Sequence, residues 1–247
     1  MTLPARITFL KADFFNHDPR RVARALLGKL LIRKTPHGIL AGRIVETEAY
    51  LPQGDPAAHA AAGRTPRNAV IFGPPGQAYV YFIYGNHYCL NASCLPEGIP
   101  GCVLFRALEP VEGIEQMAEA RGVDLGRNQV EGRAIQVRVG TAAPGCPAEQ
   151  SSANVGGQNN SGFAQANQST LKKISSGPGR LTEALGITRQ RDNAKSLISP
   201  RSDLRIADDA YRVRRVTVTP RIGISKSTAQ PLRYFIAGNP FVSGRRL

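Results

Sequence analysis

The chain has 247 residues, of which 42% are hydrophobic, so it is long enough to bury the core of a globular domain. Its 32 Lys and Arg residues outnumber its 18 Asp and Glu residues, which gives a formal net charge of +14. A charge of this size favours a polyanionic partner, with nucleic acid as the leading candidate. The basic residues are scattered instead of forming one amphipathic helix, so we expect no binding to a membrane surface.

The sequence contains no recognisable targeting or membrane-spanning pattern. No apolar run approaches the ~20 residues that a spanning helix needs. Arg6, Lys11 and Asp13 interrupt the N-terminal region, where a signal peptide would be continuously apolar. We therefore expect an intracellular protein, located in the cytoplasm or nucleoid if its source is bacterial.

The cysteines match neither a zinc-ligand spacing nor a dense disulfide framework. We expect free and mostly buried thiols. The cysteines are Cys89, Cys94, Cys102 and Cys146.

The N-terminal part of the chain predicts a helix followed by a β-hairpin. Asp18 is a suitable N-cap, Pro19 fits the first helical position, and Gly28 fits the position after the last turn. Strands are expected at Leu30–Arg33 and Ile39–Tyr50, joined by a tight turn.

The second of these strands carries two carboxylates. Because side chains alternate along a strand, Glu46, Glu48 and Tyr50 share one face. Carboxylates this close repel each other, which favours a perturbed pKa and a chemical task for at least one of them. A solvated face that bears both is the other interpretation.

The next segment combines a histidine with a polar loop. An alanine-rich turn or helix contains His59, and the loop 63–68 follows it. The side chains of Arg64, Arg67 and Asn68 in this loop suit hydrogen bonding to DNA phosphates. A merely solvated loop explains the same composition.

The stretch Tyr79–Tyr88 holds four of the seven tyrosines of the chain. Apolar and aromatic runs flank Gly85-Asn86, which tolerate the positive φ of a tight turn, so a β-hairpin is expected. Tyr84 then lies at the tip, where its ring either contacts something planar or packs on a neighbouring loop. The return strand, residues 87–94, carries Asn91.

The stretch Cys102–Leu108 is a strongly apolar strand interrupted by Arg106. Burying an unpaired guanidinium is costly, so we expect a carboxylate partner, either Glu46 or Glu48. A helix is predicted to open at Glu109-Pro110 and to run through Arg121.

The composition changes from Ala142 to Thr170, where Ser, Gly, Asn, Gln and Ala dominate and Glu149 is the only charged residue. We expect a flexible insert at 142–170 within a single domain that spans 1–247. The loop 175–180 precedes a helix and would let a phosphate approach backbone amides near Arg180. It matches neither the Walker pattern nor the dinucleotide fingerprint.

Further strands are predicted at 212–218, 221–224 and 232–236. The expected fold class is α+β. It consists of a single domain with a mixed, mostly antiparallel curved β-sheet, peripheral helices and a protruding β-hairpin.

Several stretches together carry a resemblance to known proteins. They are Arg43–Leu51, Thr65–Asn68, Tyr79–Tyr81 with Ile83–Gly85, Arg106–Pro110 and Ser176–Gly179. In this order they resemble the alkyladenine (3-methyladenine) DNA glycosylase family. The resemblance runs from about Arg20 to Ser243, and only the insert at 142–170 departs clearly from it.

The resemblance implies a monofunctional DNA glycosylase of base excision repair. Such an enzyme flips an alkylated or deaminated purine out of double-stranded DNA and hydrolyses the N-glycosidic bond, which leaves an abasic site. It implies no metal and no organic cofactor, and we expect the protein to act as a monomer.

The resemblance also assigns roles position by position. Glu48 corresponds to the general base that activates water, while Arg106 and the backbone carbonyl of Ile222 help to hold that water. Tyr84 resembles the wedge that fills the gap left by the flipped nucleotide. The base pocket has Tyr50, His59 and Tyr81 as walls and Asn91 as the gate that crowds the amino group of guanine.

Two other functions remain open on the residues alone. A non-catalytic nucleic-acid-binding protein would keep the basic charge and the tyrosine at the hairpin tip, but it gains nothing from a carboxylate that faces DNA. A metal-dependent nuclease would use Glu46, Glu48, Asp55 and His59 as ligands.

The net charge of +14 predicts that binding to duplex DNA weakens steeply with salt, because each neutralised phosphate releases counterions. Fluorescence anisotropy of a labelled duplex between about 50 and 200 mM NaCl measures the slope of log Kd against log salt. A flat response would mean that the charge serves a purpose other than DNA binding.

Overall fold

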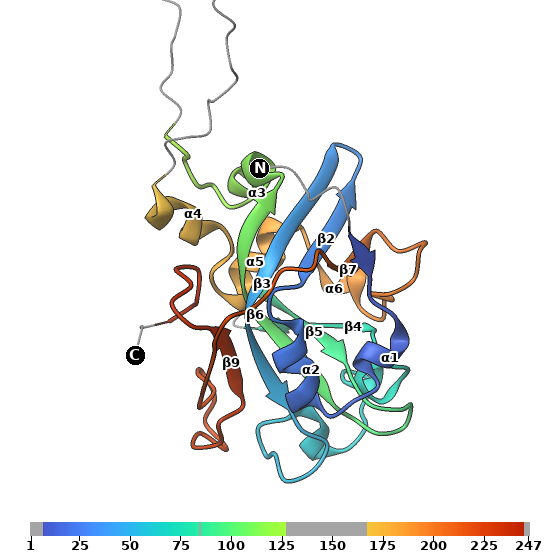
Figure 1. Ribbon diagram of the computed structural model, residues 1–247. Helices are drawn as coiled ribbons and strands as arrows, with labels where there is room; N and C mark the ends of the chain where they lie inside the picture. The colour runs from blue at the N-terminus through green and yellow to red at the C-terminus, as the bar shows by residue number, and fades with distance from the viewer. Residues whose placement is uncertain (1–6, 84, 127–166, 245–247) are drawn as a thin grey trace, which may run out of the picture. The chain divides into compact units, whose positions relative to one another are not determined.

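The long strand β3 (Gly38–Tyr50) is the central strand of the sheet. A computed structural model of the chain describes residues 7–83, 85–126 and 167–244. Along one edge, β3 pairs with β6 (Cys102–Glu112). Along the other edge it pairs first with β2 (Leu30–Thr35) and then with β9 (Arg233–Ile236) (Figure 1). The change of partner from β2 to β9 lies just before the two carboxylates of β3.

The described residues form one sheet of nine strands, and every pairing in it is antiparallel. The strand order is β1-β7-β2-β3-β6-β5-β4, while β9 pairs with β3 and β8. The predicted α+β class is confirmed, although the described part of the sheet is antiparallel throughout instead of mixed. The remaining strands are β1 (Thr8–Phe9), β4 (Ala78–Ile83), β5 (His87–Ser93), β7 (Leu204–Asp208) and β8 (Val216–Thr219).

The helices are short. Those described are α1 (Ala12–Phe15), α2 (Pro19–Leu26), α3 (Ile114–Ala120), α4 (Gln168–Ser175), α5 (Pro178–Ala184) and α6 (Arg189–Asp192), with 3-10 turns at η1 (His59–Ala62) and η2 (Ala69–Phe72). In the part of the chain that the structure describes, no helix has the length and apolar character needed to span a bilayer.

The helix predicted after Asp18 is confirmed as α2. The Asp18 carboxylate accepts a hydrogen bond from the N–H of Arg20 at 2.8 Å, and Gly28 has the positive φ, +84°, expected after the last turn. Val22 and Leu26 are fully buried and pack into the main hydrophobic core with residues of β3 and β6. This packing fixes one face of β3 and leaves its other face for the carboxylates.

The tyrosine-rich hairpin is also confirmed. Strands β4 and β5 pair from Ala78 opposite Ala92 to Ile83 opposite His87. Gly85 in the turn has a φ of +75°, which favours glycine. Tyr84 lies outside the described residues.

Three predicted elements have different ends in the structure, and a fourth is not a strand. Strand β6 continues to Glu112, so the helix predicted from Glu109 begins only at Ile114. Pro110 pairs with Gly42 beside an irregularity in the β3–β6 ladder, the kind of position at which a strand tolerates proline. The strand predicted at 212–218 is confined to β8, and the strand predicted at 221–224 is a loop.

The predicted insert is described only at its end. Residues 142–166, including Cys146, lie outside the described part of the chain. The following residues are ordered into α4, where the Asn167 side chain accepts a hydrogen bond from the N–H of Ser169 at 3.2 Å. The last residues of the predicted insert, 167–170, thus belong to the N-cap and first turn of α4. The other three cysteines are buried free thiols, as expected.

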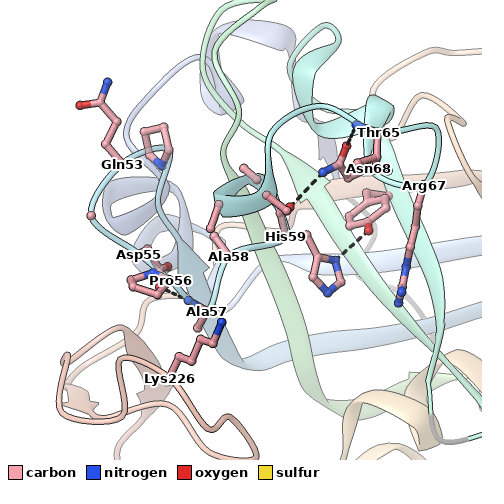
Figure 2. Close-up of a pocket in the computed structure, with 16 residues that line it drawn as sticks. Gln53, Asp55, Pro56, Ala57, Ala58, His59, Thr65, Arg67, Asn68 and Lys226 are labelled. Atoms are coloured by element: carbon pink, nitrogen blue, oxygen red, sulfur yellow. Dashed lines mark hydrogen bonds between the residues drawn. The ribbon is translucent and has the colours of Figure 1, made fainter.

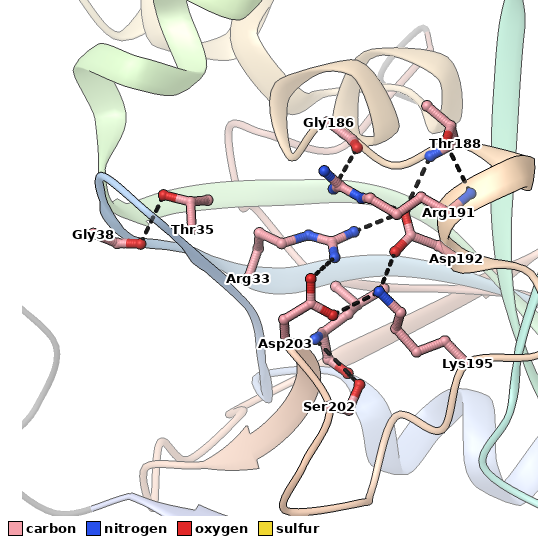
Figure 3. Close-up of polar contacts among 11 residues, drawn as sticks. Arg33, Thr35, Gly38, Gly186, Thr188, Arg191, Asp192, Lys195, Ser202 and Asp203 are labelled. Atoms are coloured by element: carbon pink, nitrogen blue, oxygen red, sulfur yellow. Dashed lines mark hydrogen bonds and ion pairs between the residues drawn. The ribbon is translucent and has the colours of Figure 1, made fainter.

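A buried ion network ties β2 to the segment that follows α6 (Figure 3). Arg33 lies 2.9 Å from carboxylate oxygens of both Asp192 and Asp203, and Lys195 contacts the same two carboxylates at 2.9 and 2.6 Å. Burial alone would raise the pKa of the Asp192 carboxyl, but the hydrogen bond from Lys195 and the charge of Arg33 lower it below its usual value. The network therefore depends on ionised carboxylates.

Asp192→Asn should lower the free energy of unfolding at neutral pH by roughly 3 kcal/mol, because buried Arg33 then keeps only Asp203 as a counter-charge. Since the folded-state pKa of Asp192 is lowered, its contribution is complete above the unfolded value of about 3.9 and is lost as the pH falls through the folded value. Urea unfolding at neutral and acidic pH measures both effects.

The control for this experiment is Asp208→Asn, which removes the more exposed ion pair with Lys29. It should cost about 1 kcal/mol or less. Equal stability of the two variants would contradict a special role for the Arg33 network.

Candidate active site

Two carboxylates on β3 are buried on the same side of the strand. Glu46 and Glu48 have no exposed surface, so the interpretation of a solvated face is wrong. Thr47, between them, faces α2 and donates a hydrogen bond to the carbonyl of Ala23 at 2.9 Å. The predicted alternation of side chains therefore holds at this point.

Arg106 of β6 is the shared partner of both carboxylates. Its Nε donates to Oε1 of Glu46 at 2.9 Å, and its Nη1 lies 3.2 Å from Oε1 of Glu48. From the sequence we expected either Glu46 or Glu48 to pair with Arg106, and in the structure both carboxylates do. One guanidinium thus separates two negative charges that would otherwise repel each other.

Glu48 receives two further hydrogen bonds. The N–H of Ile222 donates to Oε1 at 3.0 Å, and the hydroxyl of Tyr50 donates to Oε2 at 3.1 Å. Burial raises the pKa of Glu48 above its usual value, while the charge of Arg106 and the Ile222 N–H offset part of that rise. A carboxylate with a raised pKa is suited to take up a proton near neutral pH.

Ile222 reaches Glu48 because its neighbour Arg221 is anchored. Arg221 binds both oxygens of Asp55, at 2.7 and 2.6 Å, and donates to the carbonyl of Ala49 at 3.0 Å. This ion pair joins the segment after β3 to the loop before β9, although 166 residues separate its members. The carbonyl of Ile222 accepts a hydrogen bond from Nη1 of Arg106 at 3.5 Å, so its backbone touches both members of the Glu48–Arg106 pair.

Asp55 was one of four ligands considered for a metal-dependent nuclease. Both of its carboxylate oxygens are occupied by Arg221, and Oε1 of Glu46 accepts from two arginines, Arg106 and Arg233. Cations already fill the positions that a metal would need. The described residues include no group of three or more His, Cys, Asp or Glu side chains arranged to hold a metal ion.

A cavity of about 450 Å³ opens beside the Glu48–Arg106 pair. Its size falls in the range of small-molecule sites. Five residues assigned to the site by resemblance line it together, and the loop with Arg180 forms part of its rim. The lining includes Tyr50, His59, Tyr81, Arg106, Ile222, Cys89, Leu104, His87 and residues 177–180.

Tyr79 supports this site through His59, although no role in the site was predicted for it from the sequence. Its hydroxyl lies 2.8 Å from Nδ1 of His59, and the His59 ring packs edge-on against Tyr81 with 4.5 Å between ring centroids. Burial and the charge of Arg67 lower the pKa of His59, and burial raises the pKa of Tyr79 to about 12. Both groups are therefore neutral at pH 7. Period-two spacing from Tyr81 is the sequence signal that would have found Tyr79.

Asn91 lies beneath the same rings. It is buried, and its Nδ2 donates to the carbonyl of Tyr79 at 3.2 Å. It does not line the 450 Å³ cavity, but a much smaller one of about 10 Å³ that Tyr50, His59 and Tyr81 also border. The predicted gate is thus close to the rings and set behind them.

The residues predicted to contact the DNA backbone divide into two groups. Arg64, Arg67 and Arg180 are exposed, and Arg67 borders both the ring-lined cavity and a larger open hollow of about 1110 Å³ next to His59 (Figure 2). Asn68 is different. It is buried, and its side chain is committed to the loop itself.

The Asn68 amide holds the loop 63–68 closed (Figure 2). Its oxygen accepts from the N–H of Thr65 at 2.7 Å, and its nitrogen donates to the carbonyls of His59 and Gly63 at 2.9 and 2.8 Å. Both amide hydrogens are used, so the prediction that Asn68 binds phosphate is wrong. Its side chain instead places His59.

An NMR titration of His59 should give a midpoint below the ~6.5 of a free imidazole, because burial and Arg67 both disfavour the imidazolium. Arg67→Gln should raise the midpoint, while Arg67→Lys keeps the charge and should leave it lowered. A midpoint at or above the free value would contradict a neutral His59.

Comparisons with known proteins agree with the sequence motifs. The model of the methylpurine-DNA glycosylase (MPG) family matches residues 13–240. A protein from Koribacter versatilis is 52% identical over 242 residues, which cover 98% of this chain and 96% of the relative. A protein from Chlorobaculum tepidum is 39% identical over 235 residues, which cover 95% of this chain and 90% of the relative. A protein from Methanocella arvoryzae is 36% identical over 239 residues, which cover 96% of each chain.

The names of these three relatives give 3-methyladenine DNA glycosylase as a provisional assignment. The family match covers most of the chain, including the strands and loops that surround Glu48. The chain therefore belongs to the methylpurine-DNA glycosylase family and is a DNA glycosylase of base excision repair that acts on alkylated bases.

Proposed function

We propose that this protein flips an alkylated or deaminated purine out of duplex DNA and hydrolyses its N-glycosidic bond, which leaves an abasic site. One observation carries the proposal. Glu48 is a buried carboxylate with a raised pKa, held by Arg106 and Ile222, and both of these residues line the cavity with aromatic walls. A protein that only binds DNA gains nothing from this costly arrangement.

The cavity suits a flipped base. Tyr50, His59 and Tyr81 offer faces and edges for stacking, and alkylated purines carry a positive charge that aromatic rings attract. The lowered pKa of His59 favours this, because a neutral imidazole does not repel a cationic base. Asn91, behind the rings, is the proposed gate against the exocyclic amino group of guanine.

Flipping itself requires energy from DNA contacts. Unstacking a base costs a few kcal/mol, and an inserted aromatic ring offsets part of this cost. Tyr84 at the hairpin tip is the proposed wedge. Arg67 and Arg180 line the cavity, and together with the exposed Arg64 they are the proposed phosphate contacts.

The chemistry follows from the surroundings of Glu48. Glu48 takes a proton from water while Arg106 and the carbonyl of Ile222 orient that water. The water oxygen bonds to C1′ of the sugar as the C1′–N bond breaks, and the bonding electrons leave with the base. The carboxylate also stabilises the positive charge that develops on the sugar. For an alkylated purine, departure neutralises the base, so it needs no separate acid.

The proposed enzyme is monofunctional and monomeric. Among the described residues that line the cavity there is no lysine to form a Schiff base with the sugar. One chain supplies the donors that bind both oxygens of Glu48, so this part of the site needs no second copy.

Glu48→Gln should lower the single-turnover rate of base release by about 10²–10⁴-fold, the range for loss of a general base, while lesion-DNA binding persists. The assay uses a duplex with one alkylated purine and enzyme in excess, in buffer containing EDTA. Glu97→Gln removes the same charge from an exposed position and should leave the rate unchanged.

Three outcomes of this assay would contradict the proposal. Unchanged release by Glu48→Gln would remove Glu48 from its role. Lesion-DNA binding without release by the wild-type protein would favour the non-catalytic binder. Release that fails in EDTA and returns with Mg²⁺ would favour metal-dependent chemistry.

A further inference from the structure

Glu46 lies behind the Glu48–Arg106 pair and has no direct part in the proposed chemistry. Three N–H donors occupy its two oxygens. Oε1 accepts from Nε of Arg106 at 2.9 Å and from Nε of Arg233 at 2.7 Å, and Oε2 accepts from the backbone N–H of Ser243 at 2.6 Å. A fully buried carboxylate bound from three sides is rigid, and it can orient whatever it binds.

The contact with Glu46 fixes the direction in which Arg106 points. Arg106 is held through Nε by Glu46 and through Nη2 by the hydroxyl of Ser243 at 3.3 Å. Only Nη1 is then directed at Glu48 and the carbonyl of Ile222. Without Glu46, the charge attraction between Arg106 and Glu48 favours a two-pronged pair, because guanidinium and carboxylate match in geometry. That pair would occupy both oxygens of Glu48.

The rest of the network holds Glu46 itself. Arg233 of β9 uses Nη2 to bind the carbonyl of Ser243 at 2.9 Å and Nη1 to bind the hydroxyl of Thr219 at 3.3 Å. Strands β8 and β9 and the C-terminal segment at Ser243 therefore converge on Glu46. This explains why β3 changes its pairing partner from β2 to β9 at Glu46.

We propose that Glu46 is a positioning residue, which holds Arg106 so that a single nitrogen, Nη1, meets Oε1 of Glu48 and the Ile222 carbonyl, and Oε2 of Glu48 is left without a guanidinium partner. The inference rests on the proposed function, because it concerns the same reaction. It assigns Glu46 to the orientation of Arg106 instead of to metal binding or to fold stability alone.

Single-turnover kinetics of Glu46→Gln provide the test. Glutamine has nearly the same shape as glutamate, but it lacks the charge that holds Arg106. At metal sites, loss of a residue that orients a ligand costs about 10- to 100-fold, and by analogy we expect the rate of base release to fall by the same factor. Kd for lesion DNA should stay at the wild-type value. Glu46→Asp keeps the charge but withdraws the carboxylate, so it should also lower the rate.

The pH–rate profile separates positioning from a simple charge effect. The positive charge of Arg106 lowers the pKa of Glu48, whereas the negative charge of Glu46 raises it. In Glu46→Gln the two-pronged Arg106–Glu48 pair therefore moves the acid limb to lower pH, and by more than the same substitution does in the background of Arg106→Ala, where only the Glu46 charge is lost. The charged or titratable groups around Glu48 are Arg106, Tyr50, Glu46, Arg221 and Cys89.

Two controls test whether a loss of stability explains the lower rate and whether Glu46 acts through Arg106. Asp209→Asn breaks another largely buried arginine pair, in which Arg43 binds Asp209 at 2.9 and 2.8 Å away from the cavity, and it should leave the rate unchanged. In the background of Arg106→Ala, Glu46→Gln should cause no further loss of rate, because Glu46 acts through Arg106.

The proposal is overturned if Glu46→Asp and Glu46→Gln both release base at the wild-type rate, if the acid limb of Glu46→Gln stays in place or moves to higher pH, or if the effects of Glu46→Gln and Arg106→Ala on the rate are additive. These outcomes are distinct from failure of the proposed function. That failure would appear as absence of base release by the wild-type protein, or as full activity of Glu48→Gln.

Discussion

The structure around the active site depends on the burial of two carboxylates, two residues apart, on one face of β3. Taking an ion out of water costs several kcal/mol, and two like charges add their mutual repulsion. Arg106 and Arg233 supply the compensating charges, and the backbone N–H groups of Ser243 and Ile222 and the hydroxyl of Tyr50 supply further donors. Glu46 is enclosed by this network, whereas Glu48 stays beside the cavity.

This constraint explains why distant parts of the chain meet at one point. The carboxylates come from β3, Arg106 from β6 and Arg233 from β9, while Ile222 comes from a loop fixed by the Asp55–Arg221 pair. The two carboxylates stay buried and ionised only where all of these groups come together. The hairpin β4–β5 then supplies aromatic rings on the side where Glu48 is reached. The sheet therefore holds a carboxylate in place beside a cavity with aromatic walls.

The sequence predicted the parts that depend on local spacing. Alternation placed Glu46 and Glu48 on one face, and the cost of an unpaired guanidinium predicted a carboxylate for Arg106. Contacts over long distances were not predictable in this way. The loop at Ile222 resembled a strand because apolar and polar residues alternate there, but the Arg221–Asp55 pair holds it out of the sheet. Asn68 resembled a phosphate ligand because nothing local reveals that its amide closes a loop.

The most direct test of the account offers the wild-type protein a panel of duplexes, each with one damaged purine, in buffer that contains EDTA. Alkali then cleaves any abasic site that has formed. The account predicts strand breaks at one or more alkylated purines after alkali treatment, none before it, and none in undamaged duplex. Absence of breaks for every lesion, or breaks that appear before alkali, would contradict it.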